Sequence, residues 1–165
     1  MRNLLAIPLL GLAVMFQSTV MSHITLLSGY GDLPLVMLAA WSIQPRVDSG
    51  WQWAFLTSIL VGFISRVPWP VVTLSFFAIV VMAQLMRRRV WQAPLIAMFT
   101  VTFLGTIWSH FLTFAALSVG GSLLPINEVV GLVTLPSLLL NLLFAIPVYA
   151  LMRDLARWTY PGEET

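Results

Sequence analysis

The chain has 165 residues, of which 59% are hydrophobic and only 8% are charged, and its formal net charge is +2. A soluble domain covers its surface with about 25% charged residues, so this composition excludes an ordinary soluble protein and indicates an integral membrane protein. The absence of cysteine excludes disulfides and thiolate metal sites. All eight basic side chains are arginines near the ends of apolar runs, which does not indicate a nucleic-acid surface. We expect one transmembrane domain over residues 1–165.

The apolar runs, taken in order, predict an all-α fold: a polytopic bundle of six transmembrane helices. Residues 4–21 lack a small-x-small cleavage site, so we interpret them as an uncleaved first helix. The second run covers only residues 33–43, and because a straight span needs about 20 residues, we expect its helix to begin near residue 24 as a broken or re-entrant piece. The full set of expected helices is about 4–21, 24–43, 51–65, 70–86, 94–119 and 130–153, followed by a polar tail over 154–165.

The arginines predict the orientation. With the N-terminus inside, seven of the eight arginines fall on the cytoplasmic side and only Arg66 falls outside. This asymmetry is the positive-inside pattern, so both termini are expected in the cytoplasm. A basic inner face would attract anionic lipids, and docking of a cytoplasmic protein is the other possibility. That face is expected to contain Arg87, Arg88, Arg89, Arg153 and Arg157.

Nothing in the sequence predicts catalysis. Every acidic residue lies in a loop, at a helix end or in the tail, so no helix interior carries paired carboxylates for acid–base chemistry. His23 and His110 are far apart and have no nearby carboxylate or cysteine to complete a metal site. Phosphate-binding loops and serine elbows are also missing. We therefore predict that the protein is not an enzyme and uses no cofactor.

The last apolar run is unusual because it contains Pro136, Asn141 and Pro147. A proline frees a backbone carbonyl that lipid cannot satisfy, and an unpaired amide in lipid is also costly. We expect the other helices to surround this helix and to approach it at these residues. Asn141 has Ser137 and Ala145 one turn to either side, which favours either a hydrogen bond within the chain or contact with a partner's transmembrane helix.

Other polar residues inside apolar runs are candidate contacts. The fifth helix carries a stripe at spacings of three and four, which either packs inside the bundle or lines a ligand cavity with His110 as its most polar member. Gln17 has the same two interpretations as Asn141. Asp32 is expected to cap the short second helix. The stripe consists of Thr102, Thr106, Ser109, His110 and Thr113.

Residues 135–149, with Pro136, Asn141 and a Pro-Val-Tyr end before basic residues, resemble the closing helix of the rod shape-determining protein MreD family. Phe16-Gln17-Ser18-Thr19-Val20 and Gly31-Asp32-Leu33 are similar to the end of that family's first helix and to the Pro-Asp-Leu start of its second. Here Tyr30-Gly31 stands where that proline is usual. Together with the size and the short loops, the resemblance covers nearly the whole chain.

The resemblance implies a non-catalytic scaffold of cell-wall elongation in the bacterial inner membrane. It would help to maintain cell shape by binding the transmembrane helix of MreC, beside RodA, a class B penicillin-binding protein and MreB filaments.

The resemblance also implies a fold similar to the substrate-binding subunits of energy-coupling-factor vitamin transporters, and such a subunit is the alternative function. That alternative predicts a closed pocket for a vitamin-like molecule, lined by the fifth and sixth helices. Those subunits usually carry Ala-x-x-x-Ala on the first helix. Here Ala6 and Ala13 lack that spacing, and the only such pair, Ala93 and Ala97, opens the fifth helix.

Overall fold

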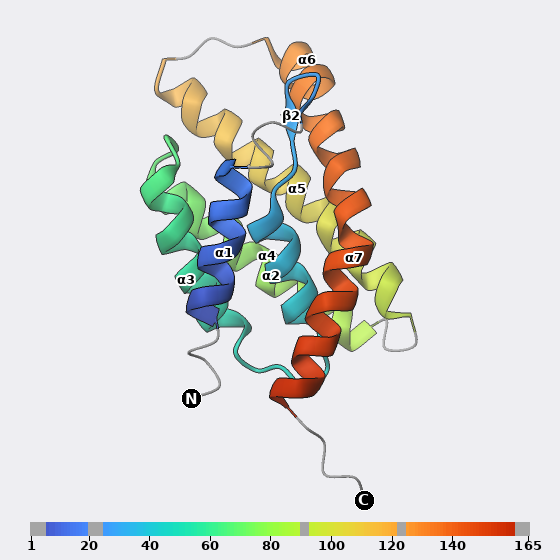
Figure 1. Ribbon diagram of the computed structural model, residues 1–165. Helices are drawn as coiled ribbons and strands as arrows, with labels where there is room; N and C mark the ends of the chain where they lie inside the picture. The colour runs from blue at the N-terminus through green and yellow to red at the C-terminus, as the bar shows by residue number, and fades with distance from the viewer. Residues whose placement is uncertain (1–5, 20–24, 90–92, 122–124, 161–165) are drawn as a thin grey trace, which may run out of the picture.

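The computed structural model describes residues 6–19, 25–89, 93–121 and 125–160 (Figure 1). Over these ranges the chain is almost entirely helical, and three helical stretches are long and apolar enough to span a membrane. They are α4 (Trp69–Arg89), α5 (Pro94–Val119) and the continuous stretch Ile126–Thr159. The shorter apolar helices are α1 (Ala6–Thr19), α2 (Leu33–Ile43) and α3 (Gly50–Ile64).

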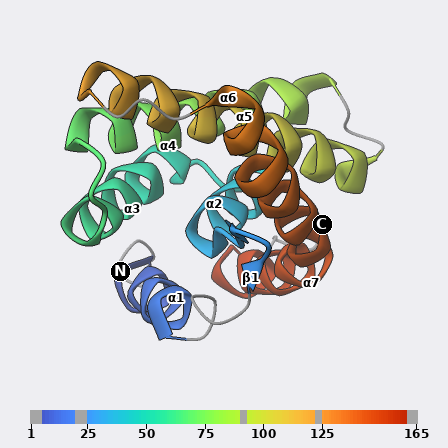
Figure 2. The ribbon, with the colours of Figure 1, turned by 90° about the horizontal axis from the view of Figure 1, so that it is seen from above.

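Helix α2 lies at the centre of the bundle. All of its 11 residues are buried, and Figure 2 shows the other helices arranged around it. Its sequence is apolar on nearly every side, so it has no face suited to water. Trp41 of α2 stacks on Trp53 of α3, with ring centroids 4.3 Å apart. The expectation that the last helix is the surrounded one is therefore wrong.

A short hairpin precedes α2. Strand β1 (Thr25–Leu26) pairs with β2 (Gly29–Tyr30) in antiparallel register, and α2 begins only at Leu33. The predicted helix over 24–43 is thus wrong between residues 25 and 32, because Gly29 and Gly31 are poor helix formers and the capping residue Asp32 follows them. Asp32 is that cap: its Oδ1 accepts the backbone N–H of Leu35 at 3.0 Å, as the sequence predicts.

The last helical stretch has three parts. α6 (Ile126–Glu128) leads into the π-helical turn η3 (Val129–Thr134) and then into α7 (Leu135–Thr159). The π-helical turn ends two residues before Pro136, which has no N–H to continue the regular hydrogen-bond ladder. At its other end, α7 continues past the predicted end at residue 153, so residues 154–159 are helical and not part of a tail. Residues 161–165 lie outside the described ranges.

The other boundaries are close to those predicted. α5 has the predicted bounds, with proline at its start and Gly120 just after its end. It crosses the bundle diagonally (Figure 1), as expected for a 26-residue helix in a membrane whose hydrocarbon core is about 30 Å thick. α4 extends three residues beyond its predicted end and includes Arg87, Arg88 and Arg89. The ends of the predicted first helix, residues 4–5 and 20–21, are outside the described part of the chain.

Arginine and aromatic side chains join the helix ends at one end of the molecule. The Arg87 guanidinium donates to the backbone carbonyls of Gln44 at 3.1 Å and Val47 at 2.8 Å. The Ser49 hydroxyl accepts from the Trp41 indole at 3.1 Å and lies 3.3 Å from the Tyr160 hydroxyl. These contacts bring together the turn after α2 and the C-terminal ends of α4 and α7. We call this the basic end, and it carries Arg46, Arg87, Arg88, Arg89, Arg153 and Arg157.

The substitution Arg87→Met tests whether Arg87 holds this end together. It keeps the apolar stem but removes two charge-assisted hydrogen bonds, so we expect the free energy of unfolding to fall by about 2–3 kcal/mol. The matched control Arg89→Met removes an exposed arginine from the last position of the same helix and should change stability by less than about 0.5 kcal/mol. Thermal unfolding in detergent measures both, and equal effects would contradict a structural role for Arg87.

Candidate functional site

The connecting segment, residues 28–33, runs into α2 alongside the last helix. Three of its backbone N–H groups are satisfied by that helix, at alternate residues. Ser28 N donates to the Leu132 carbonyl at 3.1 Å, and Tyr30 N donates to the Ser137 hydroxyl at 2.9 Å. Asp32 N donates to Asn141 Oδ1 at 2.6 Å. In an extended chain, successive backbone N–H groups point to opposite edges, so alternate residues donate on the same edge. Along that edge the last helix takes the place of a neighbouring strand.

Gln17 of α1 satisfies the other edge. Its Nε2 donates to the Gly31 carbonyl, and its Oε1 accepts the N–H of Leu33 at 2.9 Å. A glutamine amide offers a donor and an acceptor side by side, as a peptide group does, so it can bind one edge of an extended chain at two points. Of the two interpretations of Gln17, the structure has the contact within the chain.

Pro136 and Gly29 explain why the segment fits so closely against the helix. Pro136 cannot donate to the carbonyl four residues earlier, Leu132, and this carbonyl is the acceptor for Ser28. At Gly29 an added Cβ would lie 2.6 Å from the Ser137 nitrogen and 2.7 Å from the Pro136 Cβ. Only glycine permits this approach.

Pro147 does not take part in this contact. It lies on the exposed side of α7, so the expectation that a neighbouring helix approaches there is wrong. Among the described residues, no backbone group from outside the helix donates to the Leu143 carbonyl that Pro147 frees. The two prolines of this helix therefore differ: Pro136 faces the connecting segment and Pro147 faces outward.

Part of the α5 stripe completes the network from a third side. Asn141 Nδ2 donates to Thr106 Oγ1 at 3.0 Å, and Thr106 Oγ1 donates to the Thr102 carbonyl at 2.7 Å. His110 Nδ1 lies 3.2 Å from Thr134 Oγ1, and its ring stacks on Tyr30 with centroids 5.9 Å apart.

The Thr102 hydroxyl is buried without a hydrogen-bond partner among the residues that the structure describes. We call the network around the connecting segment the polar seam; its side chains are Gln17, Thr106, Ser137 and Asn141.

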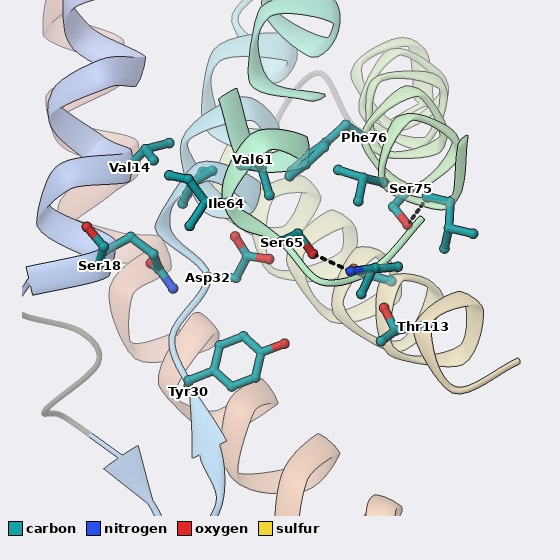
Figure 3. Close-up of a pocket in the computed structure, with 16 residues that line it drawn as sticks. Val14, Ser18, Tyr30, Asp32, Val61, Ile64, Ser65, Ser75, Phe76 and Thr113 are labelled. Atoms are coloured by element: carbon teal, nitrogen blue, oxygen red, sulfur yellow. Dashed lines mark hydrogen bonds between the residues drawn. The ribbon is translucent and has the colours of Figure 1, made fainter. Parts of the chain in front are cut away.

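A pocket of about 290 Å³ lies on the other side of the connecting segment, between α1, α3, α4 and α5. Figure 3 shows the Asp32 carboxylate and the Tyr30 ring at this pocket, with Ser65 and Thr113 across from them. Ser109 of the predicted stripe also lines the pocket, whereas His110 is not among its lining residues. The stripe is thus divided: some members pack against the last helix and two line a cavity.

Asp32 has a position that the sequence did not reveal. Through its N–H it meets Asn141, which lies near the middle of the 34-residue stretch from Ile126 to Thr159. A carboxylate beside the middle of a long apolar helix is costly in a membrane protein, and such residues usually mark functional sites. Its place between a glycine and the start of a helix suggested only a cap. In the sequence, only the apolar residues around Asp32 indicate that this carboxylate lies inside the membrane.

The chemistry of the site is that of binding and positioning. The pocket combines one carboxylate with several hydroxyl groups, which suits a ligand that donates hydrogen bonds. No cluster of three His, Asp or Glu side chains that could hold a metal ion occurs in the described ranges. At the basic end, Arg88, Arg89 and Arg157 are exposed, and Arg153 Nε lies 3.2 Å from Asp154 Oδ1.

Comparison of the chain with protein-family models, with curated proteins and with solved structures finds no match in any of the three.

Asn141→Leu tests the polar seam. The substitution keeps the size of the side chain but leaves the Asp32 N–H without its acceptor, so we expect the free energy of unfolding to fall by about 2–4 kcal/mol. Asn127→Leu is the matched control, because Asn127 is exposed on α6 and its replacement should cost less than about 0.5 kcal/mol. If both variants unfold at the temperature of the native protein, Asn141 does not support the fold.

Alanine substitutions at two glycines test the close approach of the connecting segment to the last helix. Gly29→Ala should destabilise the protein by about 2–3 kcal/mol, because the new methyl group meets backbone atoms of the last helix. Gly131→Ala meets nothing within 4 Å and lies in a helical turn, so it should be neutral or stabilise by up to about 1 kcal/mol. Unfolding temperatures of the two variants on the same side of the native value would contradict the close approach at Gly29.

Proposed function

We propose that this protein is a scaffold of the MreD type in the bacterial inner membrane, which binds the transmembrane helix of MreC and so helps to position cell-wall synthesis. RodA, a class B penicillin-binding protein and MreB would be its further partners. One observation carries the proposal. Four of the residues on which the resemblance rests come from three distant parts of the chain and meet around the connecting segment, whereas Pro147 does not. Asp32 lies in the connecting segment, and Gln17, Pro136 and Asn141 contact that segment.

This convergence matters because apolar sequences share composition without sharing structure. A chance likeness in composition would not require Gln17 to bind residues on both sides of Asp32, or Asn141 to bind Asp32 itself. Such a network is a physical reason for these residue types to occur together in one family. This network is the observation on which the proposal rests.

The proposal includes six crossings with both termini in the cytoplasm. α2 alone reaches only about 16 Å, but four extended residues before it add about 13 Å, which together match a hydrocarbon core of about 30 Å. Non-helical backbone at this depth is tolerated where protein satisfies it, as the polar seam does. Six of the eight arginines lie at the basic end, which would face the cytoplasm.

The partner helix would bind outer surfaces rather than the polar seam. Gln17 and Asn141 direct their amides into contacts within the chain, so they are not available to a second protein. The last helix instead presents an apolar outer face, on which van der Waals packing can hold a partner helix. Leu135, Leu139 and Leu143 are 54%, 59% and 67% exposed on this face.

The test is co-purification with full-length MreC from a rod-shaped bacterium. We expect a stable complex in detergent and in lipid nanodiscs. The matched control is MreC with its transmembrane helix replaced by an unrelated one of equal length, which should lose binding. Thermal unfolding first shows that the purified protein is folded. If this folded protein forms no complex with native MreC, the scaffold proposal is overturned.

The alternative, a substrate-binding subunit of an energy-coupling-factor vitamin transporter, has one observation in its favour: the pocket beside Asp32. Its volume of about 290 Å³ is near the lower end for small-molecule sites. The predicted lining is wrong in part, because α5 contributes to the pocket but the last helix does not. A vitamin-like molecule that co-purifies with the native protein and is lost in Asp32→Asn would favour this alternative.

A further inference from the structure

A groove of about 640 Å³ opens at the basic end, between the beginning of α5 and the last turns of α7. One wall is formed by Pro94 and Leu95, and another by the turn after α2, including Arg46. It is separate from the pocket beside Asp32 and shares no lining residue with it. The groove is not used by the polar seam.

A single face of α7 forms the floor of the groove and changes character along its length. Ile146, Ala150, Arg153 and Arg157 follow one another at spacings of three and four, which places them on one side of the helix. The first two are apolar and the last two are cationic. From Ile146 to Arg157 the helix rises about 16 Å, roughly half the thickness of a hydrocarbon core.

Positive charge gathers at one end of the groove from two parts of the fold. Arg46 comes from the turn after α2, and Arg153 and Arg157 come from α7. Arg153 pairs with Asp154 at 3.2 Å, while Arg46 and Arg157 have no ion pair within the described ranges. Guanidinium groups bind phosphate oxygens with paired hydrogen bonds, so this end suits a phosphate group.

The other end of the groove is open to an apolar surrounding. Leu95 and Ile146 are 46% and 55% exposed, although neither has a polar atom in its side chain to hydrogen-bond with water. In a membrane these side chains would face acyl chains. The groove therefore has the polarity of an amphiphile that stands in the inner leaflet, with its anionic head at the arginines and its tail beside Leu95.

We propose that this groove is a binding site for an anionic glycerophospholipid. Its phosphate group lies among Arg46, Arg153 and Arg157, and one acyl chain lies along Leu95, Ile146 and Ala150. The lipid joins the turn after α2 to the end of α7. This site goes beyond the scaffold function and does not depend on it, because it requires only that the basic end lies at a membrane surface.

The experiment measures lipid retained by the native protein after extraction from nanodiscs that contain phosphatidylcholine, with or without phosphatidylglycerol. Native mass spectrometry counts the bound lipid. We expect phosphatidylglycerol to be retained and phosphatidylcholine to be lost. Equal retention of both would overturn the proposal. Free glycerol phosphate that competes as well as the lipid would also overturn it, because the acyl chain would then contribute nothing.

Matched double variants test the charge. Arg46→Gln with Arg157→Gln removes two exposed arginines from the groove, and Arg88→Gln with Arg89→Gln removes two exposed arginines of the basic end outside it. The first pair should weaken phosphatidylglycerol retention about 30-fold, equivalent to about 2 kcal/mol, and the second pair only a few-fold. Equal losses in the two pairs would show general surface attraction and contradict a site.

A third variant tests the apolar half without changing charge, so the proposal stays testable if the arginine variants do not fold. Ala150→Trp fills the groove and should reduce phosphatidylglycerol retention at least tenfold, by about 1.4 kcal/mol. Leu143→Trp, on an exposed face outside the groove, should leave retention unchanged. Full retention in Ala150→Trp would contradict the proposed path of the acyl chain.

Discussion

The structure depends on hydrogen bonds to a piece of extended backbone inside a helical membrane protein. In hydrocarbon an unsatisfied N–H or carbonyl group is costly, so non-helical backbone must find partners within the protein. The connecting segment finds them on both edges: Gln17 on one side, and Ser137, Asn141 and the Leu132 carbonyl on the other. These contacts fix α1 and α7 against the segment. Removing either edge would leave polar backbone groups in an apolar surrounding.

The position of α2 follows from this constraint. The connecting segment leads directly into α2 (Figure 1), and Asp32 both caps the helix and donates its own N–H to Asn141. Once the segment is held between α1 and α7, its short helix can only continue into the middle of the bundle. A sequence that is apolar on all sides is suited to that place. The position of α2 is thus fixed by polar contacts to the connecting segment before it, and its side chains then fill the centre of the bundle by apolar packing.

Much of this could be predicted from the sequence, because a polar residue inside an apolar run needs a partner. Gln17, Thr106 and Asn141 are predicted contacts for that reason, and Pro136 because it frees a backbone carbonyl. All four belong to the polar seam or border it. The helix bounds at Pro94 and Gly120 were also readable, because these residues start and end helices for local reasons. What could not be predicted was the pairing. Asp32 and Asn141 are 109 residues apart, and helical periodicity carries no information about contacts at that distance.

The depth of Asp32 was missed for a related reason. Counting apolar residues assumes that a crossing is helical throughout, so a short run appears to need more helix. An extended residue covers about twice the length of a helical one, and a few such residues replace a missing turn and a half or more. Because these extended residues come before the helix, they also place its capping residue, Asp32, away from the membrane surface. In the proposed scaffold the polar seam thus serves the protein's own architecture, so a partner helix is bound by apolar helix faces and a lipid by the arginines of the basic end.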